Sequence, residues 1–142
     1  MPRIVFVIAT ALLLVSATSQ AETSPAERLA EAVRFKTISH QDRSKVDGDE
    51  FRRFHDFLRT TYPRVFTQLE VESINEFSLL IRWPGTDAEL PPVLFTAHMD
   101  VVPIEPGTED DWQQPPFAGI IEDERIYGRG TLDDKEGVLG LL

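Results

Sequence analysis

Apolar and polar positions recur with helical spacing in the first part of the chain. Ser24 is a candidate N-cap, Pro25 suits the first helical position, and Glu27 completes a capping box three residues after the cap. These signals predict a helix that begins at residue 25. A second helix is predicted over residues 49–61, and Pro63 follows it as a stop. Its apolar stripe consists of Phe51, Phe54 and Leu58, which Phe57 widens.

After the second helix the pattern changes to that of strands. Residues 65–74 alternate roughly between apolar and polar positions, and residues 76–83 form a second strand candidate. Residues 93–97 form a nearly continuous apolar run, which predicts a strand buried on both faces. A hairpin is predicted around residues 120–127, and a last helix over residues 133–142. This order of helices and strands predicts the opening of an α/β domain.

The first residues have the pattern of an export signal. A basic start, an apolar run over residues 4–15 and a small-residue exit with Ser19 and Ala21 predict a signal peptide over residues 1–21. Cleavage after Ala21 leaves a mature segment over residues 22–142. We therefore expect a secreted or periplasmic protein with no stable membrane association after cleavage. An uncleaved N-terminal anchor is the alternative, although the run is shorter than the roughly 20 apolar residues of a membrane span.

Composition narrows the possible chemistry. The 142 residues contain 24 Asp and Glu against 14 Lys and Arg, which gives a formal net charge of −10. Such an acidic chain offers no basic surface for a phosphate backbone, so we expect no nucleic-acid partner. The chain has no cysteine, which excludes disulfide scaffolds, thiol catalysis and cysteine-type zinc fingers. Any metal ion would have to be held by imidazole and carboxylate groups.

His98 and Asp100 are the first candidates for chemistry. They follow directly on the apolar run of residues 93–97, and binding sites in open α/β sheets lie beyond the carboxyl ends of strands. Residues two apart in extended chain point the same way, so the Asp100 carboxylate is expected to reach the His98 ring. A carboxylate on one ring nitrogen strengthens the other nitrogen as a metal ligand. The alternative is a solvated turn in which His98 is a capped core histidine.

A second cluster lies in residues 128–135, Gly-Arg-Gly-Thr-Leu-Asp-Asp-Lys. Glycines at 128 and 130 allow the backbone to approach a bound species, and the carboxylate of Asp133 at the end of the loop suits a bridge between two divalent ions. The alternative is a helix start, in which Thr131 is the N-cap and Asp134 completes a capping box. Both interpretations stay open at the level of these residues.

Other polar and aromatic groups predict little chemistry. His55 beside the aromatic stripe and His40 in a polar loop are expected to be surface residues without a ligand role. Residues 112–117 predict a packed loop, with a peptide-docking surface as the alternative. The acidic run of residues 109–111 is expected to be a solvated loop, with a calcium site as the alternative.

Taken together, residues 95–103, 112–117 and 127–135 resemble the M20 family of zinc hydrolases, in particular its branch of carboxypeptidase S and N-acyl-amino-acid hydrolases. The resemblance implies a zinc-peptidase-like catalytic domain with a mixed sheet flanked by helices. It implies that His98 is a metal ligand, that Asp100 is the catalytic acidic residue behind it, and that Asp133 bridges two zinc ions. It further implies that Asp134 is not a ligand and that the peptide bond between Asp133 and Asp134 is cis.

The resemblance predicts a metal-dependent hydrolase that cleaves amide bonds of peptides, in the manner of a carboxypeptidase, or of N-acyl amino acids. Two zinc ions are expected per complete site, and other divalent ions are possible. The family's catalytic Glu and the remaining metal ligands are not among these 142 residues. We therefore expect residues 22–142 to be the incomplete N-terminal portion of the catalytic domain, inactive by itself. A non-catalytic pseudoenzyme or binding module is the alternative.

Overall fold

The computed structural model describes residues 23–142, so the predicted signal peptide lies outside the described residues. Helix α1 (Pro25–Val33) begins with the predicted capping box: the Ser24 hydroxyl accepts from the Glu27 amide at 3.2 Å, and the Glu27 carboxylate accepts from the Ser24 amide at 2.7 Å. Helix α2 (Gly48–Thr61) begins at Asp47, whose carboxylate caps the first turn. Both helices confirm the sequence prediction to within a residue or two.

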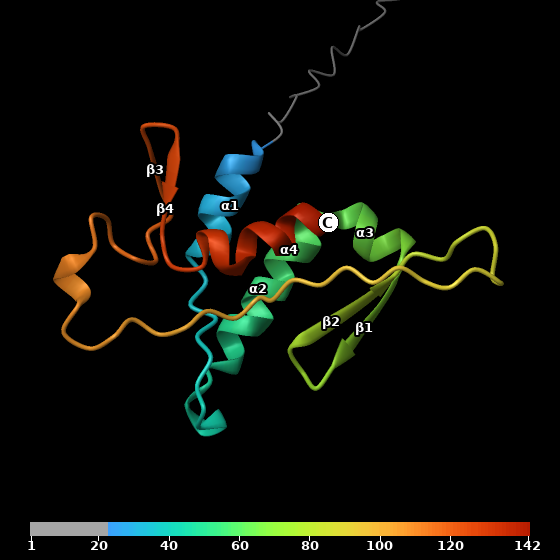
Figure 1. Ribbon diagram of the computed structural model, residues 1–142, viewed down its shortest axis with the longest axis horizontal. Helices are drawn as coiled ribbons and strands as arrows, with labels where there is room; N and C mark the ends of the chain where they lie inside the picture. Colours follow the sequence, from blue (N-terminus) through green and yellow to red (C-terminus); the bar gives the residue numbers. More distant parts are fainter. Residues whose placement is uncertain (1–22) are drawn as a thin grey trace, which may run out of the picture.

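The core lies where α1, α2 and the last helix, α4 (Glu136–Leu141), pack together (Figure 1). Ala32, Phe54, Leu58 and Val138 form its buried cluster. Full burial of a side chain such as Phe54 contributes about 1.5–3 kcal/mol. The predicted apolar stripe of α2 is therefore the face that holds the helices together. No helix within residues 23–142 is long and apolar enough to cross a membrane.

Two small antiparallel sheets lie beside these helices. Strands β1 (Glu70–Ile74) and β2 (Ser78–Arg82) form one sheet, and β3 (Ile120–Glu122) and β4 (Arg125–Tyr127) form the other. Asp123 (φ 47°) and Glu124 (φ 60°) form the two-residue turn between β3 and β4, and their positive φ values are those of a type I′ hairpin turn. The turn between β1 and β2 has three residues, of which Asn75 (φ 49°) and Glu76 (φ 74°) also have positive φ. The predicted hairpin of residues 120–127 is confirmed.

The prediction for residues 65–74 is wrong in its first half. Pro63 follows the end of α2 and also occupies the first turn of a new helix, α3 (Pro63–Gln68). Proline suits this position because its fixed φ is already helical and its missing N–H would have no partner there. The strand β1 therefore begins only at Glu70.

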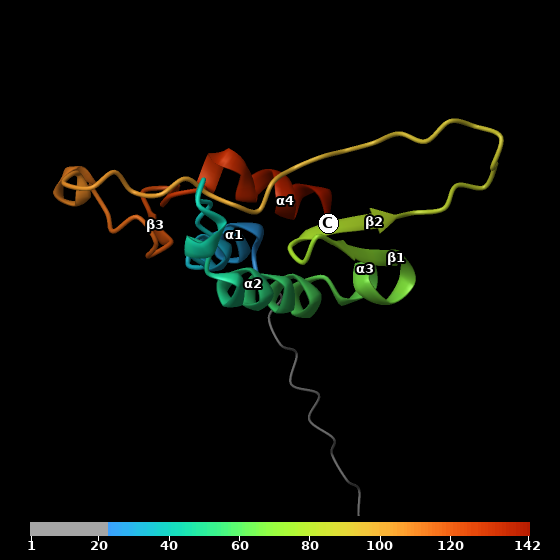
Figure 2. The same cartoon turned by 90° about the horizontal axis from the view of Figure 1, so that it is seen from below.

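The prediction of a buried strand over residues 93–97 is also wrong. This segment runs extended from the loop after β2 toward the helices, as Figure 2 shows, but it is not a strand in the structure. Val93, Leu94 and Phe95 are 78, 77 and 72% exposed. An extended segment becomes a strand only when a neighbour supplies backbone hydrogen bonds, and no strand within residues 23–142 lies along it.

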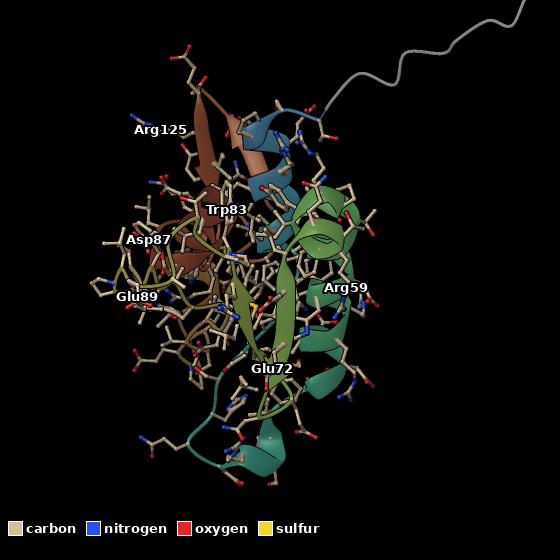
Figure 3. All side chains as sticks on the ribbon, turned by 90° about the vertical axis from the view of Figure 1, so that its right-hand side faces the viewer. Arg59, Glu72, Trp83, Asp87, Glu89 and Arg125 are labelled. Atoms are coloured by element: carbon tan, nitrogen blue, oxygen red, sulfur yellow. The ribbon has the colours of Figure 1, made fainter. Side chains whose placement is uncertain are left out.

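The expected mixed sheet is accordingly not formed within the described part of the chain, which has only the two antiparallel pairs and one isolated parallel bridge, between Ile38 and Val101. The combination of helices and small sheets still confirms the α/β class. Short 3₁₀ turns at Arg43–Lys45 and Glu109–Asp111 and an irregular turn at Thr131–Lys135 complete the elements. The long loop after β2 carries Trp83, Asp87 and Glu89, which are exposed; Asp87 and Glu89 lie at the edge of the molecule in Figure 3.

Candidate metal site

His98 is fixed by a short parallel pairing that follows it directly. The Val101 amide donates to the Thr37 carbonyl at 2.9 Å, and the Ser39 amide donates to the Val101 carbonyl at 2.9 Å. These bonds join the segment after α1 to the segment after His98, around the Ile38–Val101 bridge. Val101 is 2% exposed, so the pairing is part of the core. The backbone on the C-terminal side of His98 is therefore held although the run before it is exposed.

The second half of the site is the turn that leads into α4. Gly130 has φ 86°, and a Cβ at this position would lie 2.4 Å from a methyl group of Val101. Only glycine allows this close approach of the turn to the segment after His98. The capping-box alternative is not formed, because the Thr131 hydroxyl donates to the Gly128 carbonyl at 2.8 Å and the turn has no side-chain cap.

Asp133 and Asp134 both contact His98. The Asp133 carboxylate lies 2.9 Å from Nε2 of the His98 ring, although 35 residues separate the two in the chain. The Asp134 carboxylate accepts a hydrogen bond from the His98 backbone amide at 3.2 Å. The peptide bond between the two aspartates is cis, as expected. The structure thus confirms that the two sequence clusters meet.

Asp100 lies beside the other ring nitrogen, but not as the sequence suggested. Nδ1 of His98 is 3.0 Å from the Asp100 backbone carbonyl and 3.4 Å from its carboxylate. The backbone of residue 100 comes closer to the ring than its side chain does, so the backbone oxygen is the hydrogen-bond acceptor. The carboxylate contributes as a nearby negative charge on the same side of the ring. An acceptor on Nδ1 leaves Nε2 to face Asp133.

Electrostatics around His98 favour a positive partner. Partial burial lowers the pKa of His98, but the hydrogen bonds to Asp100 and Asp133, together with the charges of these two carboxylates, outweigh it, so the net pKa is raised. The ring is 48% exposed and the Asp133 side chain 86% exposed. A cation, whether a proton or a metal ion, is therefore stabilised between them, at a position that solvent can reach.

The residues present supply part of a metal site. A tetrahedral ion with bonds near 2 Å places two donor atoms about 3.3 Å apart, and Nε2 of His98 and the Asp133 carboxylate oxygen are 2.9 Å apart. The donor types, nitrogen and carboxylate oxygen, are those that zinc takes. Residues 23–142 contain no group of three or more potential metal ligands. His98 and Asp133 thus fit a metal ion as two of the three protein ligands that a catalytic zinc generally needs.

Two buried polar residues near the site had no signal in the sequence. Lys135 is 0% exposed, and its ammonium donates to the carbonyls of Ala32 at 2.8 Å and Phe35 at 2.5 Å. Burial lowers the pKa of Lys135 to about 7, and the charge of Glu50 opposes this shift. Thr37 is also 0% exposed, and its hydroxyl donates to the Met99 carbonyl at 2.6 Å. A lysine next to acidic residues and a threonine in a loop look like surface residues in a sequence.

The remaining histidines lie elsewhere. His55 was expected at the surface but is 4% exposed, because it lies on the buried face of α2, where Nε2 meets the Phe77 carbonyl at 3.0 Å. Burial lowers the pKa of His55. His40 is half-buried. Residues 112–117 agree with the packed-loop interpretation, since the Arg129 guanidinium lies 5.1 Å from the Trp112 ring and the Arg129 amide donates to the Pro116 carbonyl.

Comparison with known proteins places this pair of clusters in a family. Residues 94–142, which include His98, Asp100 and Asp133, match the model of peptidase family M20/M25/M40. The chain is 43% identical over 129 residues to probable carboxypeptidase S-like 2 of Dictyostelium discoideum, covering 89% of the chain and 24% of that relative. It is 38% identical over 120 residues to carboxypeptidase S of Saccharomyces cerevisiae, covering 79% of the chain and 21% of that relative.

A third relative carries a different activity in its name. The chain is 37% identical over 118 residues to the N-fatty-acyl-amino acid synthase/hydrolase PM20D1 of Xenopus tropicalis, covering 82% of the chain and 22% of that protein. The chain spans about a quarter of the length of these relatives. The matched residues include both sequence clusters of the site. The chain belongs to the M20 peptidase family, in the branch of the carboxypeptidase S-like and PM20D1 proteins.

Proposed function

We propose that the protein is a metal-dependent hydrolase that cleaves the amide bond of peptides or N-acyl amino acids at a site with two zinc ions. The observation that carries the proposal is the contact between His98 and Asp133. These residues come from two distant segments of the chain, and the contact places an imidazole nitrogen 2.9 Å from a carboxylate oxygen. Membership of the M20 family supports the same chemistry.

Each residue of the site has a role that its contacts support. His98 would bind one metal ion through Nε2, because Nδ1 already faces the Asp100 carbonyl. Asp133 would bridge two ions, since its carboxylate is exposed apart from its contact with the ring. Asp100 would act as the catalytic acidic residue behind His98, holding negative charge 3.4 Å from Nδ1. When bound, a metal pair supplies Lewis acidity that polarises a carbonyl and activates water at neutral pH.

A cleft of about 490 Å³ beside His98 and Asp100 offers space for a substrate. Phe51, Phe77 and Leu79 supply apolar walls, and Arg43 supplies a positive charge. Carboxypeptidases and N-acyl-amino-acid hydrolases have a common substrate chemistry, because the C-terminal residue of a peptide is itself an N-acylated amino acid with a free carboxylate. We propose such a compound as the substrate, with an apolar group in this cleft. The export pattern of residues 1–21 supports a secreted or periplasmic enzyme.

The test is an assay of the protein expressed at its natural length. Release of free amino acid from dipeptides and N-acyl amino acids should be lost after chelation, return on addition of zinc, and be abolished by His98→Ala. Glu89→Ala is the control, because Glu89 is exposed in the loop after β2 and does not line this cleft. Chelator-resistant turnover, or turnover that survives His98→Ala, would contradict the proposal. Zinc and substrate binding without turnover would instead support a non-catalytic binding protein.

A further inference from the structure

Within the described residues, the buried polar or charged side chains are Thr37, His55 and Lys135. Burying such a group without a partner costs free energy, so each is expected to have one. The His55 ring forms a hydrogen bond with the backbone carbonyl of Phe77, in the turn between β1 and β2. Thr37 and Lys135 instead join the two halves of the candidate metal site to one short stretch of chain, residues 32–39. We call this stretch the anchor.

Thr37 joins the anchor to the first half of the site. Its hydroxyl donates to the carbonyl of Met99, the residue between His98 and Asp100, at 2.6 Å. The backbone bonds around Val101 hold the chain only after Asp100. The hydroxyl of Thr37 therefore fixes the Met99–Asp100 peptide group, which lies between the proposed ligand and the carboxylate behind it.

Lys135 joins the anchor to the second half. Its side chain crosses the core to the carbonyls of Ala32 and Phe35, at the C-terminal end of α1. The Ala32 carbonyl, in the last turn of α1, also accepts from the Phe35 amide at 3.3 Å, and Phe35 lies two residues past the helix. Either protonation state of the amine carries the two N–H groups that these bonds need. The nitrogen also lies 5.0 Å from the centre of the Phe54 ring, so the side chain is enclosed. Lys135 thereby fixes the turn that carries Asp133, two residues earlier.

We propose that Thr37 and Lys135 are positioning residues that hold His98 and Asp133 in register through their common anchor. The proposal rests on the proposed function, because it assumes that His98 and Asp133 are both metal ligands. Neither side chain touches the space between His98 and Asp133. The two ligands come from segments 35 residues apart, so other contacts must hold these segments together. Thr37 and Lys135 supply such contacts, and a ligand geometry that is fixed before the ion binds raises metal affinity.

A pair of substitutions at Thr37 separates positioning from packing. Thr37→Val keeps the shape and removes the hydroxyl, whereas Thr37→Ser keeps the hydroxyl and removes a methyl group. If the hydrogen bond to Met99 positions the site, Thr37→Val lowers zinc affinity about tenfold, in the range typical of outer-shell partners, and Thr37→Ser stays within about threefold of wild type by the same comparison. If Thr37 only fills space, the order is reversed, because serine leaves a cavity and valine does not.

The experiment measures zinc affinity by competition with a chromophoric chelator, on protein of natural length, together with the visible spectrum of the cobalt-substituted protein. Thr37→Val should weaken zinc binding and alter the cobalt spectrum, and Lys135→Met should do the same. Leu58→Val is the control for lost stability alone, because Leu58 is 1% exposed and its aliphatic side chain makes no hydrogen bond to either half of the site. It should leave affinity and spectrum unchanged.

A second measurement needs no variant. Zinc binding to wild-type protein should slow hydrogen exchange at the amides of Ser39 and Val101, which hold the anchor to the first half, more than at amides of the β1–β2 hairpin. Equal affinities for wild type and Thr37→Val, or a weaker Thr37→Ser, would overturn the inference, as would unchanged exchange in the anchor. If wild type and His98→Ala bind zinc equally, the proposed function itself fails.

Discussion

The His98 ring and the Asp133 carboxylate face each other at 2.9 Å across a gap of 35 residues in the sequence. Neither residue lies in a regular strand, and the apolar run before His98 is exposed. The contact forms because the segment after His98 and the turn before α4 both pack on the chain that follows α1. The site is thus organised by a few specific bonds to α1 and its C-terminal extension.

Two adjacent aspartates allow a matched test of the ligand assignment. Asp133→Ala removes a carboxylate that faces the ring, whereas Asp134→Ala removes one that only accepts from the His98 amide. Zinc affinity, measured by chelator competition, should fall more than about 100-fold for Asp133→Ala and about 10-fold for Asp134→Ala, because outer-shell partners usually contribute 10–100-fold. If the two variants lost zinc affinity equally, Asp133 would not be the metal ligand that the site assigns it to be.

Asp100 is expected to have a moderate effect on metal binding. Its backbone carbonyl, which no substitution removes, lies at 3.0 Å from Nδ1 of His98, and its carboxylate lies at 3.4 Å. Asp100→Ala should therefore weaken zinc binding by about 10-fold, the lower end of the outer-shell range, while lowering turnover further if the residue is catalytic. Comparing zinc affinity with kcat measured at saturating zinc separates the two roles. A loss of affinity as large as that of His98→Ala would show that the carboxylate, rather than the backbone, orients the ring.

Acid should destabilise the protein partly through His55. Its pKa in the folded state lies below the ordinary value of 6.5, because burial disfavours the charged ring and Arg59 adds to this, against opposing effects of the Phe77 carbonyl and Asp56. As pH falls through 6.5, the unfolded chain binds a proton that the folded chain resists, so stability that is complete above this pH is progressively lost.

The measurement is urea unfolding of wild type and His55→Gln between pH 5.5 and 7.5, without added metal. His98 has the opposite sign, since its raised pKa gives stability below 6.5 that is lost as pH rises through the folded-state pKa. This contribution is present in both proteins and cancels in the comparison. His55→Gln should lose less stability than wild type on acidification, and parallel curves would contradict the buried neutral state of His55.

Two glycines should respond oppositely to alanine. Gly119 has φ 57°, and a Cβ there would lie 2.0 Å from the Ala30 carbonyl oxygen in α1. Gly119→Ala should therefore destabilise the protein by about 2–4 kcal/mol, from overpacking and an unfavourable backbone conformation. Gly140, in α4, has open space around the same position. Gly140→Ala should stabilise by about 0.5–1 kcal/mol, the helix preference for alanine. Denaturant unfolding measures both, and a neutral Gly119→Ala would show that β3 does not approach α1 this closely.

The sequence predicted those elements whose signals are local. The capping box at Ser24, the apolar stripe of α2 and the hairpin around Asp123 and Glu124 depend on residues a few positions apart. The run of residues 93–97 was misjudged because a strand depends on partners, which no local pattern specifies. The helix α3 was missed because a proline that ends one helix equally well begins the next.

For the site, the residues themselves left two interpretations open at each cluster. The resemblance to the M20 family chose between them, and it correctly placed Asp133 next to His98. It gave no indication of Thr37 and Lys135, whose roles depend on where two loops meet the end of α1. The burial of Lys135 cannot be predicted from the sequence, because its partners are backbone carbonyls and every residue has one.

The most direct test of the central claim is anomalous diffraction at the zinc edge from crystals of the protein at its natural length, grown with zinc. We predict an anomalous peak within bonding distance, about 2.0–2.2 Å, of both Nε2 of His98 and a carboxylate oxygen of Asp133, with a second peak about 3.5–4 Å away that shares Asp133. A zinc-loaded crystal in which His98 and Asp133 remain bonded only to each other, with the metal elsewhere, would contradict the account.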